Sequence, residues 1–553
     1  MPCAQLGGRR AAPRGAPGEP GNDHGNPLRT SGISRTALAR ASHPRSGMSY
    51  RNKTRSFLVP LSGALLSLAI SAGCSDSDSP VDGDGGGGSG GAAPHAGNGG
   101  VAPRAGSAGL SEPEGGAAGA NEQRAGAGGE GGEGGRPEAP PIGVNRPERR
   151  DFSSALLAQL RTKPGFRVAV FATAVSNARM LALGPEGAVY VTTPMTSQVF
   201  RLTDLDDDGD VDDENERVLV ASSAVTPALQ GVHGIAFSGG KVYLAATKSV
   251  VSGTVAADGS FTDLQALLTD LPDGGQHPNR TLAVGPDNLL YVSVGSDCNA
   301  CAESNSEHAS VLRLNLDGSA AANPNNDAHP MLAHNPLSMV SDRVWASGLR
   351  NTLGFDWNPT GGTLWGIDQG SDGLGEETPP EEINLLSGGN SYGWPYCWGA
   401  RNPDPTVDDP SQILTKQQYC PTTTPSLGSG LPAHSSPIAF RFYTGGEFPA
   451  EYTNDAFLVL RGSWGRLVPE GYKVVRVHFQ NGQLAPLAGT GVPYEDFLAG
   501  FLIENGTAHF GRLAGLTFDA LGALLVSDDT NGMIYRVSYD DAASGGGGAG
   551  AQP

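Results

Sequence analysis

Short apolar runs joined in pairs by a glycine-containing turn recur along the chain, and this repeat restricts the possible folds more than any other feature. Each unit reads as a strand, a tight turn and a second strand. Most units begin roughly 50 to 70 residues apart, a spacing typical of propeller blades in which four strands and their loops repeat. The units are 179–191 (RMLALGPEGAVYV), 233–245 (HGIAFSGGKVYLA), 280–292 (RTLAVGPDNLLYV), 351–367 (NTLGFDWNPTGGTLWGI) and 513–526 (LAGLTFDALGALLV).

The long gap between residues 351 and 513 has room for about two further starts, and residues 434–459 offer one. We therefore expect an all-β fold in residues 151–541, a six-bladed β-propeller of four-stranded antiparallel blades. Propellers of this size form a single unit with one large core.

The first 150 residues have a different composition. Residues 48–74 resemble a lipoprotein-type signal peptide, because basic residues precede an apolar stretch that is too short to span a membrane. This segment ends in Ser-Ala-Gly-Cys, so we expect Cys74 to be lipidated, although Ser71 stands where the pattern prefers leucine. Met48 is then the expected initiator, and residues 1–47 are expected to be untranslated or disordered.

Residues 75–150 contain mainly Gly, Ala, Ser, Pro and Glu, a composition that cannot bury enough apolar surface to offset the entropy of ordering. We expect a disordered tether there and a disordered tail at 542–553. The sequence thus predicts an exported protein, lipid-anchored to a bacterial outer membrane on its periplasmic or cell-surface face. A formal net charge of −20 argues against nucleic acid as a partner.

The cysteines of the expected folded part fall into two close pairs, Cys298 with Cys301 and Cys397 with Cys420. No histidine is spaced to complete a zinc site with either pair. A redox CxxC motif would follow a strand in a thioredoxin-like unit, and the sequence has no such unit. Two disulfides are the simplest interpretation.

A histidine stands just before the third repeat unit. His277 follows a Gly-Gly turn and leads into the apolar run 289–294, so it is expected on a loop at the mouth of a sheet. Such a histidine can act as a base or merely complete a loop. A second stretch supplies Gly-Leu-Arg-Asn at 348–351, Glu-Ile-Asn-Leu at 382–385 and Asn-Ser-Tyr-Gly-Trp-Pro at 390–395.

Together these motifs resemble the glucose/sorbosone dehydrogenase family, soluble sugar dehydrogenases that carry pyrroloquinoline quinone (PQQ). The resemblance covers about residues 166–539 and is strongest to the L-sorbosone dehydrogenase branch. It implies that His277 is the catalytic base and that Arg350 and Asn351 bind PQQ. The family commonly has an arginine four residues after its histidine, whereas here Arg280 comes three after and Thr281 follows.

The resemblance also implies further ligands. Its candidates for the PQQ carboxylates are Arg466, Lys473 and Arg512, with Gln369 as a further cofactor contact. For the calcium ion that accompanies PQQ, the matching positions are Gly370, Ser371, Glu382 and the carbonyl of Tyr392. The family has a Gly-Pro step where this chain has Gly370 and Ser371, and because backbone carbonyls coordinate the ion the change is tolerable.

A second calcium candidate does not depend on the resemblance. Carboxylates alternate in DLDDDGDVD at 204–212, with a glycine at the turn, a pattern that suits a hard cation. A solvated acidic loop is the alternative, since the twelfth position of a full EF-hand loop holds Asn215. The residues of this candidate site are Asp204, Asp206, Asp208 and Asp212.

The predicted function is oxidation of a sugar or sugar aldehyde, with His277 removing a proton as hydride passes to the quinone. The chain has no CxxCH haem motif, so a separate quinone or cytochrome is expected to take the electrons. A non-catalytic cell-surface propeller that binds carbohydrate or protein is one alternative. A calcium-dependent lactonase is another, and Asp528 and Asp529 lie at a strand end where such an enzyme would place carboxylates.

Overall fold

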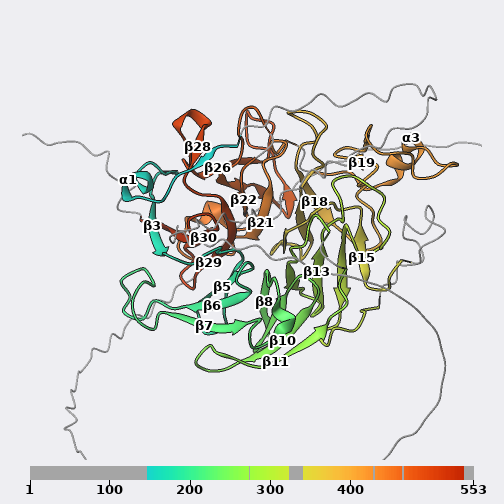
Figure 1. The fold of residues 1–553 in the computed structure, drawn as a ribbon. Helices are drawn as coiled ribbons and strands as arrows, with labels where there is room; N and C mark the ends of the chain where they lie inside the picture. The colour runs from blue at the N-terminus through green and yellow to red at the C-terminus, as the bar shows by residue number, and fades with distance from the viewer. Residues whose placement is uncertain (1–145, 273–274, 323–339, 428–429, 464–465, 541–553) are drawn as a thin grey trace, which may run out of the picture. The chain divides into compact units, whose positions relative to one another are not determined.

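The computed structural model describes residues 146–272, 275–322, 340–427, 430–463 and 466–540, and these residues form an all-β fold (Figure 1). The expected signal peptide with Cys74, the segment 1–47, most of the tether and the tail at 542–553 lie outside the described residues. The described helices are short, among them α1 (Ser154–Leu157) and α3 (Lys416–Tyr419). No helix within the described ranges has the length and apolar character needed to cross a membrane.

Three consecutive sheets contain four antiparallel strands each, paired in chain order. The first contains β4 (Leu181–Leu183), β5 (Val189–Thr193), β6 (Gln198–Leu202) and β7 (Arg217–Ser222). The second contains β8 (Gly234–Ser238), β9 (Lys241–Ala245), β10 (Val250–Val255) and β11 (Phe261–Leu268). The third contains β12 (Leu282–Val284), β13 (Leu290–Val294), β14 (Ser310–Leu314) and β15 (Val344–Ser347).

The following sheets vary this pattern. One has three strands, β16 (Gly354–Trp357), β17 (Leu364–Asp368) and β18 (Glu382–Leu386). The next has β21 (Pro437–Phe442), β22 (Ala456–Leu460), β23 (Lys473–Val477) and β26 (Tyr494–Ala499), with β2 (Arg161–Thr162) at its edge. Another has β29 (Leu513–Phe518), β30 (Leu524–Asp528), β31 (Met533–Tyr539) and β3 (Phe166–Ala172).

Small pairings complete the list of strands. They are β1 (Glu148–Arg149) with β28 (Ala508–His509) and β27 (Leu502–Ile503), β19 (Cys397–Trp398) with β20 (Asn402–Pro403), and β24 (Phe479–Gln480) with β25 (Gln483–Leu484).

The predicted strand pairs are confirmed. The unit 179–191 forms β4 and β5, in which Leu181 pairs with Val191, and the other units form the first two strands of their own sheets. The further start at 434–459 forms β21 and β22. The second strands of these pairs are buried at every position or nearly so, which explains why they stand out in the sequence as short apolar runs.

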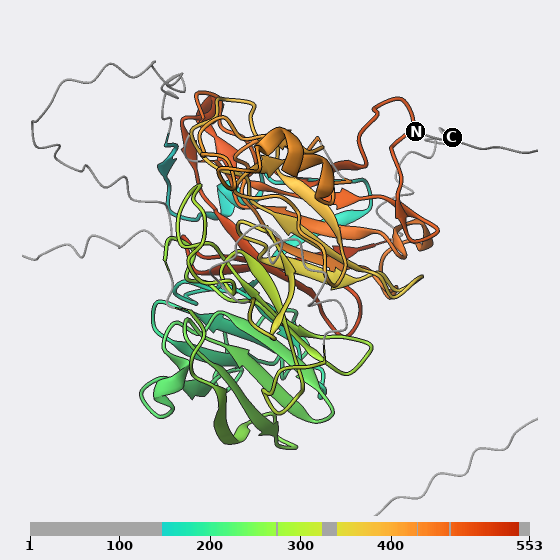
Figure 2. The ribbon, with the colours of Figure 1, turned by 90° about the vertical axis from the view of Figure 1, so that its right-hand side faces the viewer.

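The first strands of neighbouring sheets contact one another in series, β4 with β8, β8 with β12, β16 with β21, β21 with β29, and β29 with β4. A narrow cavity of about 30 Å³ runs between them and is lined from β4, β8, β12, β16, β21 and β29 or the residues just before them. The sheets therefore lie around a common axis, in the manner of a β-propeller (Figures 1 and 2).

The two ends of the described chain meet in one sheet, because β3 pairs antiparallel with β31, with Phe166 opposite Tyr539. The ring of Phe166 packs edge-on against Phe448, Tyr452 and Phe497, with centroids 4.8 to 5.3 Å apart. An aromatic core thus joins the closing strand to the neighbouring sheet that begins with β21.

Candidate functional site

Polar residues immediately precede the first strand in each of these sheets. Because the first strands line one cavity, these residues gather at one end of it. Contacts link them: Arg179 Nε donates to His233 Nε2 at 3.3 Å, and His233 Nδ1 donates to the carbonyl of Arg280 at 3.1 Å. The residues in these positions are Arg179, His233, Arg280, Asn351, Ser436 and Arg512.

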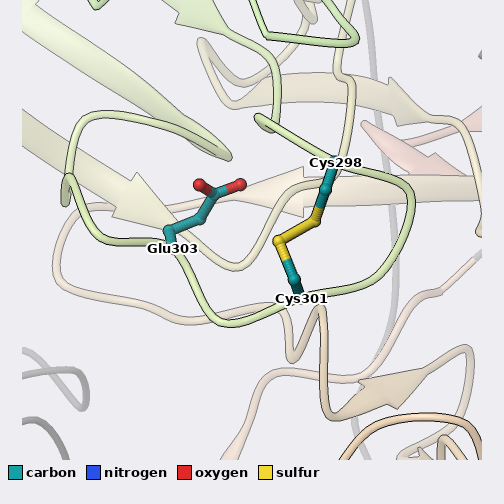
Figure 3. A group of neighbouring side chains, drawn as sticks. All are labelled: Cys298, Cys301 and Glu303. Atoms are coloured by element: carbon teal, nitrogen blue, oxygen red, sulfur yellow. A yellow bond between two sulfur atoms is a disulfide. The ribbon is translucent and has the colours of Figure 1, made fainter. Parts of the chain in front are cut away.

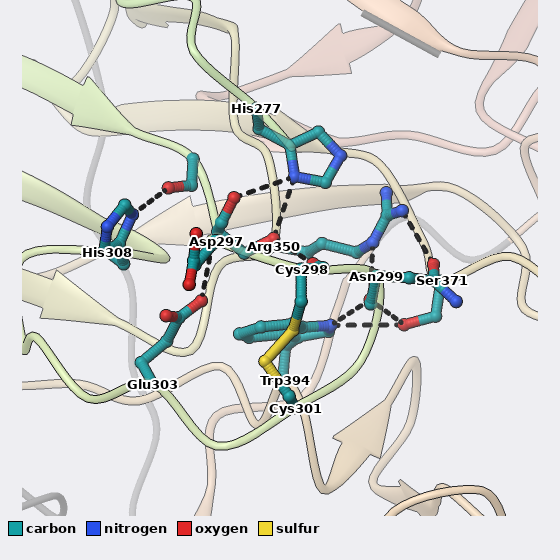
Figure 4. The surroundings of a disulfide bond; sticks show 12 residues. His277, Asp297, Cys298, Asn299, Cys301, Glu303, His308, Arg350, Ser371 and Trp394 are labelled. Atoms are coloured by element: carbon teal, nitrogen blue, oxygen red, sulfur yellow. Dashed lines mark hydrogen bonds between the residues drawn. A yellow bond between two sulfur atoms is a disulfide. The ribbon is translucent and has the colours of Figure 1, made fainter. Parts of the chain in front are cut away.

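His277 lies on the loop before β12 and is buried. Its Nδ1 lies 3.1 Å from the carbonyl of Ser296 and 2.9 Å from the Ser296 hydroxyl, which itself donates to the carbonyl of Cys298 (Figure 4). Since a carbonyl only accepts, Nδ1 carries the proton and Nε2 keeps the lone pair. Burial and the nearby Arg350 lower the pKa of His277 to about 3, which keeps the ring neutral at neutral pH.

Arg280 has a structural part in this arrangement. The side chain is fully buried and donates from Nη1 to the carbonyl of His277 at 2.6 Å and from Nη2 to the carbonyl of Pro272 at 3.1 Å. Arg280 therefore fixes the backbone of the loop that carries His277.

Arg350 is buried beside His277, and its guanidinium is held by two neighbours. Nε donates to the carbonyl of Asn299 at 2.9 Å, and Nη2 donates to Asn299 Oδ1 at 2.8 Å and to Asp372 at 3.1 Å. Nη1 makes a longer contact of 3.5 Å with the carbonyl of Gln369. Part of the Arg350 charge is thus already balanced by Asp372, whose pKa is lowered by His434 and Arg350 even though burial opposes the shift.

Asn351 follows Arg350 and faces the same space. Its Nδ2 donates to Gln369 Oε1 at 3.0 Å, and Gln369 Nε2 donates onward to the carbonyl of Pro437 at 2.9 Å. A Cβ at Gly295 would come within 2.5 Å of His277 Cβ and 2.8 Å of Asn351 Oδ1, so only glycine fits there. The predicted residues His277, Arg350, Asn351 and Gln369 are therefore neighbours.

The predicted calcium positions also come together. Gly370, Ser371, Glu382 and Tyr392 line a closed space of about 10 Å³, together with Asp368 and Trp398. Asp368 accepts hydrogen bonds from the backbone N–H groups of Arg350 and Asn351. Burial and the charge of Asp368 raise the pKa of Glu382 to about 7, and burial raises the pKa of Asp368 to about 6. Two buried carboxyl groups at one small cavity suit a cation.

An arginine cluster that the sequence analysis missed lies at the same end of the axis. Arg179 and Arg461 both pair with Asp529, at 2.5 and 2.9 Å, and Arg512 lies close by. Burial and the charge of Arg461 lower the pKa of Arg512 to about 10, and its buried Nε has no hydrogen-bond partner. Three guanidinium groups with Asp529 between them suit an anionic ligand.

Two predicted cofactor residues make other contacts. Arg466 pairs with Glu377 at 2.6 Å and donates to the carbonyl of Glu376 at 2.7 Å, so it ties the loop at 376–377 to its own loop. Lys473 begins β23 and pairs with Asp496 of β26 at 2.8 Å. Arg512 is the member of the predicted trio that lies within the arginine cluster.

A family model described as TrAA12-like matches residues 160–540, more than half of the 553-residue chain. The chain belongs to the TrAA12-like family. This result agrees with the family resemblance inferred from the motifs, since two relatives of the chain carry PQQ-dependent names.

Three relatives of this TrAA12-like chain illustrate its similarity to known proteins. A PQQ-dependent sugar dehydrogenase of Hypocrea jecorina is 25% identical over 354 residues, covering 57% of this chain and 76% of the relative. A PQQ-dependent pyranose dehydrogenase of Coprinopsis cinerea is 27% identical over 321 residues, covering 50% of this chain and 41% of the relative. An uncharacterized protein of Borreliella burgdorferi is 26% identical over 399 residues, covering 70% and 92%.

Solved structures share the fold. The calcium structure of Trichoderma reesei Carbohydrate-Active Enzymes Family AA12 matches with a TM-score of 0.55 at 23% identity, covering 69% of this chain and 97% of that chain. The holo form of the pyranose dehydrogenase PQQ domain from Coprinopsis cinerea matches with a TM-score of 0.54 at 22% identity, covering 71% and 98%.

Both predicted disulfides are present in the TrAA12-like domain, Cys298–Cys301 and Cys397–Cys420. Glu303 lies beside the first of them (Figure 3). Because its two sulfur atoms are bonded to each other, they offer no thiolate to a metal, and this group has only the carboxylate of Glu303 as a ligand.

The acidic loop is a separate feature of the domain. The carboxylates of Asp204, Asp206 and Asp208 lie within 4.8 Å of one another. Asp212 instead accepts hydrogen bonds from the backbone and hydroxyl of Thr173. The structure therefore brings together three of the four predicted calcium ligands of this loop, Asp204, Asp206 and Asp208, but not Asp212.

Proposed function

We propose that this protein oxidises a sugar or sugar aldehyde with bound PQQ. The observation that carries the proposal is a buried, neutral histidine, His277, beside Arg350 and Asn351. Its Nε2 is unprotonated and can accept a proton. PQQ-dependent names among the relatives support the same function. We also infer that the sheets form a six-bladed propeller, because β4, β8, β12, β16, β21 and β29 all contribute to the lining of the axial cavity.

The residues at the axis fit PQQ by their chemistry. PQQ is a tricarboxylate, and the arginine cluster with its partnerless Arg512 Nε can hold carboxylates. Arg350 and Asn351 supply further donors on the His277 side, so they would hold the quinone end of the cofactor. PQQ supplies the hydride-accepting quinone. Arg466 and Lys473 remain candidates that would need a different arrangement of their ion pairs.

Ser296 and Arg280 position His277 for proton transfer. Ser296 accepts from Nδ1 of His277 and so directs the unprotonated Nε2 away from its own loop. A sugar hydroxyl at hydrogen-bonding distance from Nε2 gives up its proton to the imidazole as hydride leaves the same carbon. Arg280 holds the carbonyl of His277 and so fixes the backbone that carries the imidazole.

Calcium is the second expected ligand. Glu382, the carbonyls of Gly370, Ser371 and Tyr392, and the neighbouring Asp368 offer the oxygen ligands that Ca²⁺ requires. An ion there would lie beside Arg350 and Gln369 and would polarise the quinone. The loop that holds Asp204, Asp206 and Asp208 is a second candidate for calcium.

Two alternatives have less support. A binding propeller without catalysis needs no neutral base beside Arg350 and Asn351. A calcium-dependent lactonase needs several carboxylates at the axis, whereas Asp529 is paired with two arginines there.

For the whole protein we propose export, a lipid anchor at Cys74, and a separate quinone or cytochrome as electron acceptor. Substitution of Cys74 by serine should move the protein from the membrane fraction to the soluble fraction.

The proposal is tested by titrating the purified protein with PQQ in the presence of Ca²⁺ and following dye reduction with aldoses and sorbosone. His277→Ala should keep PQQ binding and lose about 10²- to 10⁴-fold in kcat, the usual contribution of a general base. His478→Ala is the control, because this histidine lies against Asp455, outside the site. Absence of PQQ binding at micromolar concentration would contradict the proposal.

A further inference from the structure

Asn299 lies inside the ring closed by the Cys298–Cys301 disulfide and contacts both sides of the candidate site. Its backbone carbonyl accepts from Arg350 Nε, and its side-chain Oδ1 accepts from Arg350 Nη2 and from the backbone N–H of Asp372 at 2.8 Å. Its Nδ2 donates to the carbonyl of Asp372 at 2.9 Å. Asn299 thus holds the guanidinium of Arg350 (Figure 4) and also the loop that carries the Asp372 carboxylate.

The same carbonyl reaches the predicted calcium loop. Trp394 Nε1 donates to it at 3.2 Å, and the hydroxyl of Ser371 donates to it at 3.3 Å. Asn299 therefore connects Arg350 with a residue that lines the small cavity.

The disulfide gives Asn299 a fixed backbone. Cys298 and Cys301 are three residues apart, and the segment between β13 and β14 that contains them has no regular secondary structure. Closing so short a ring restricts the conformations of the residues inside it. The same segment contains Ser296, whose hydroxyl donates to the carbonyl of Cys298 and accepts from His277. The base and the arginine are therefore held by one cross-linked loop.

We propose that Asn299 is a positioning residue which, together with the Cys298–Cys301 disulfide, sets the orientation of Arg350 for ligand binding. The inference rests on the proposed function in so far as the ligand is PQQ. Arg350 Nε and Nη2 are engaged by Asn299, so Nη1, with its long contact to Gln369, is the donor directed at the ligand. Without the side-chain Oδ1, Nη2 keeps only Asp372 and Nε keeps only the backbone carbonyl of residue 299, so the guanidinium loses this direction.

The test compares Asn299→Ala with Asn299→Asp in the full chain. Alanine removes the side-chain acceptor, whereas aspartate keeps an oxygen for Arg350. Asn315→Ala is the matched control, because the amide of Asn315 also makes two hydrogen bonds but lies on an exposed turn. A Cys298→Ser/Cys301→Ser double variant tests the contribution of the ring and should change both readouts in the same direction as Asn299→Ala.

The first readout needs no cofactor. The protein is treated with phenylglyoxal, which modifies accessible arginines, and the modified positions are found by mass spectrometry. The Arg350 side chain is 4% exposed, so it is protected in the parent protein. We expect Arg350 to become reactive in Asn299→Ala and to stay protected in Asn299→Asp. Fully buried Arg280 should stay protected throughout and reports that the fold is intact.

The second readout is the Kd for PQQ. We expect Asn299→Ala to raise it about 10- to 100-fold, the effect of losing a hydrogen bond to a charged group. The inference is overturned if Arg350 stays protected in Asn299→Ala, if Asn299→Asp exposes Arg350 as strongly as alanine does while Arg280 stays protected, or if the Kd does not change. If the unsubstituted protein binds no PQQ but Arg350 still becomes reactive in Asn299→Ala, the proposed function is refuted. The positioning role of Asn299 is then retained.

Discussion

At the scale of single residues, His277 determines how the reaction should depend on pH. The base must be neutral to accept a proton, and its pKa of about 3 lies below that of a free histidine, about 6.5, chiefly because the ring is buried. The neutral form therefore persists as the pH falls from 8 to 5. We expect kcat/KM, measured over this range at saturating PQQ, to show no decline from protonation of His277. An acid limb with an apparent pKa between 6 and 7 that disappears in His277→Asn would contradict this.

Asp529 provides a second prediction at this scale. Its side chain is 4% exposed and pairs with Arg179 and Arg461, so Asp529→Asn leaves these guanidinium groups without their carboxylate. We expect a loss of about 3–5 kcal/mol in the free energy of unfolding, measured by denaturant titration without PQQ. Added PQQ should restore part of the loss, because its carboxylates would replace the missing charge.

The neighbouring Asp528 is the matched control. Burial raises the pKa of Asp528 to about 7, so its neutral form is already populated near neutral pH, and an amide can keep the acceptor used by the backbone N–H of Arg512. Asp528→Asn should therefore cost much less than Asp529→Asn. Equal losses for the two variants would show that burial, and not the pairing with arginine, determines the stability.

At the scale of elements, β3 closes the sheet formed by the C-terminal strands. A chain that begins at residue 146 should keep the thermal midpoint of the full protein, whereas a chain that begins at residue 176 loses β3 and exposes the edge of β31. We expect the shorter chain to aggregate. Phe166→Ala, which keeps the strand but removes its aromatic contacts, should cost about 3–5 kcal/mol by denaturant titration. Cooperative unfolding of the 176 chain at an unchanged midpoint would refute this role.

The sequence predicts the first two strands of each sheet because they are short, largely buried apolar runs on either side of a turn, a local signal. It also predicts His277, Arg350 and Asn351 through contiguous motifs. Arg179 and Arg461 were missed because they meet Asp529 only through long-range closure of the ring. A signal for part of the site was nevertheless present, since Arg179 and His233 occupy the first position of their repeat units, as Asn351 does in its own.

At the scale of the whole molecule, calcium should stabilise the protein through linkage. Ca²⁺ that binds only the folded chain adds about 2.7 kcal/mol at one hundred times its Kd. We therefore expect the thermal midpoint to fall by a few degrees when EDTA replaces excess Ca²⁺. The two candidate calcium sites have different ligands, so substitutions at each site can show which one binds the ion.

Glu382→Gln removes one of the buried carboxyl groups at the small cavity, whereas Asp206→Asn/Asp208→Asn removes two carboxylates of the acidic loop. If the ion is held at the cavity, Glu382→Gln abolishes the shift caused by EDTA and weakens PQQ binding, because the cavity adjoins Arg350 and Gln369. The variant of the acidic loop then keeps both the shift caused by EDTA and the binding of PQQ. The opposite pattern would assign calcium to the acidic loop, and a shift lost only when both sites are changed would assign an ion to each. If EDTA leaves the midpoint of the parent protein unchanged, the buried carboxyl groups of Glu382 and Asp368 serve the fold without a metal.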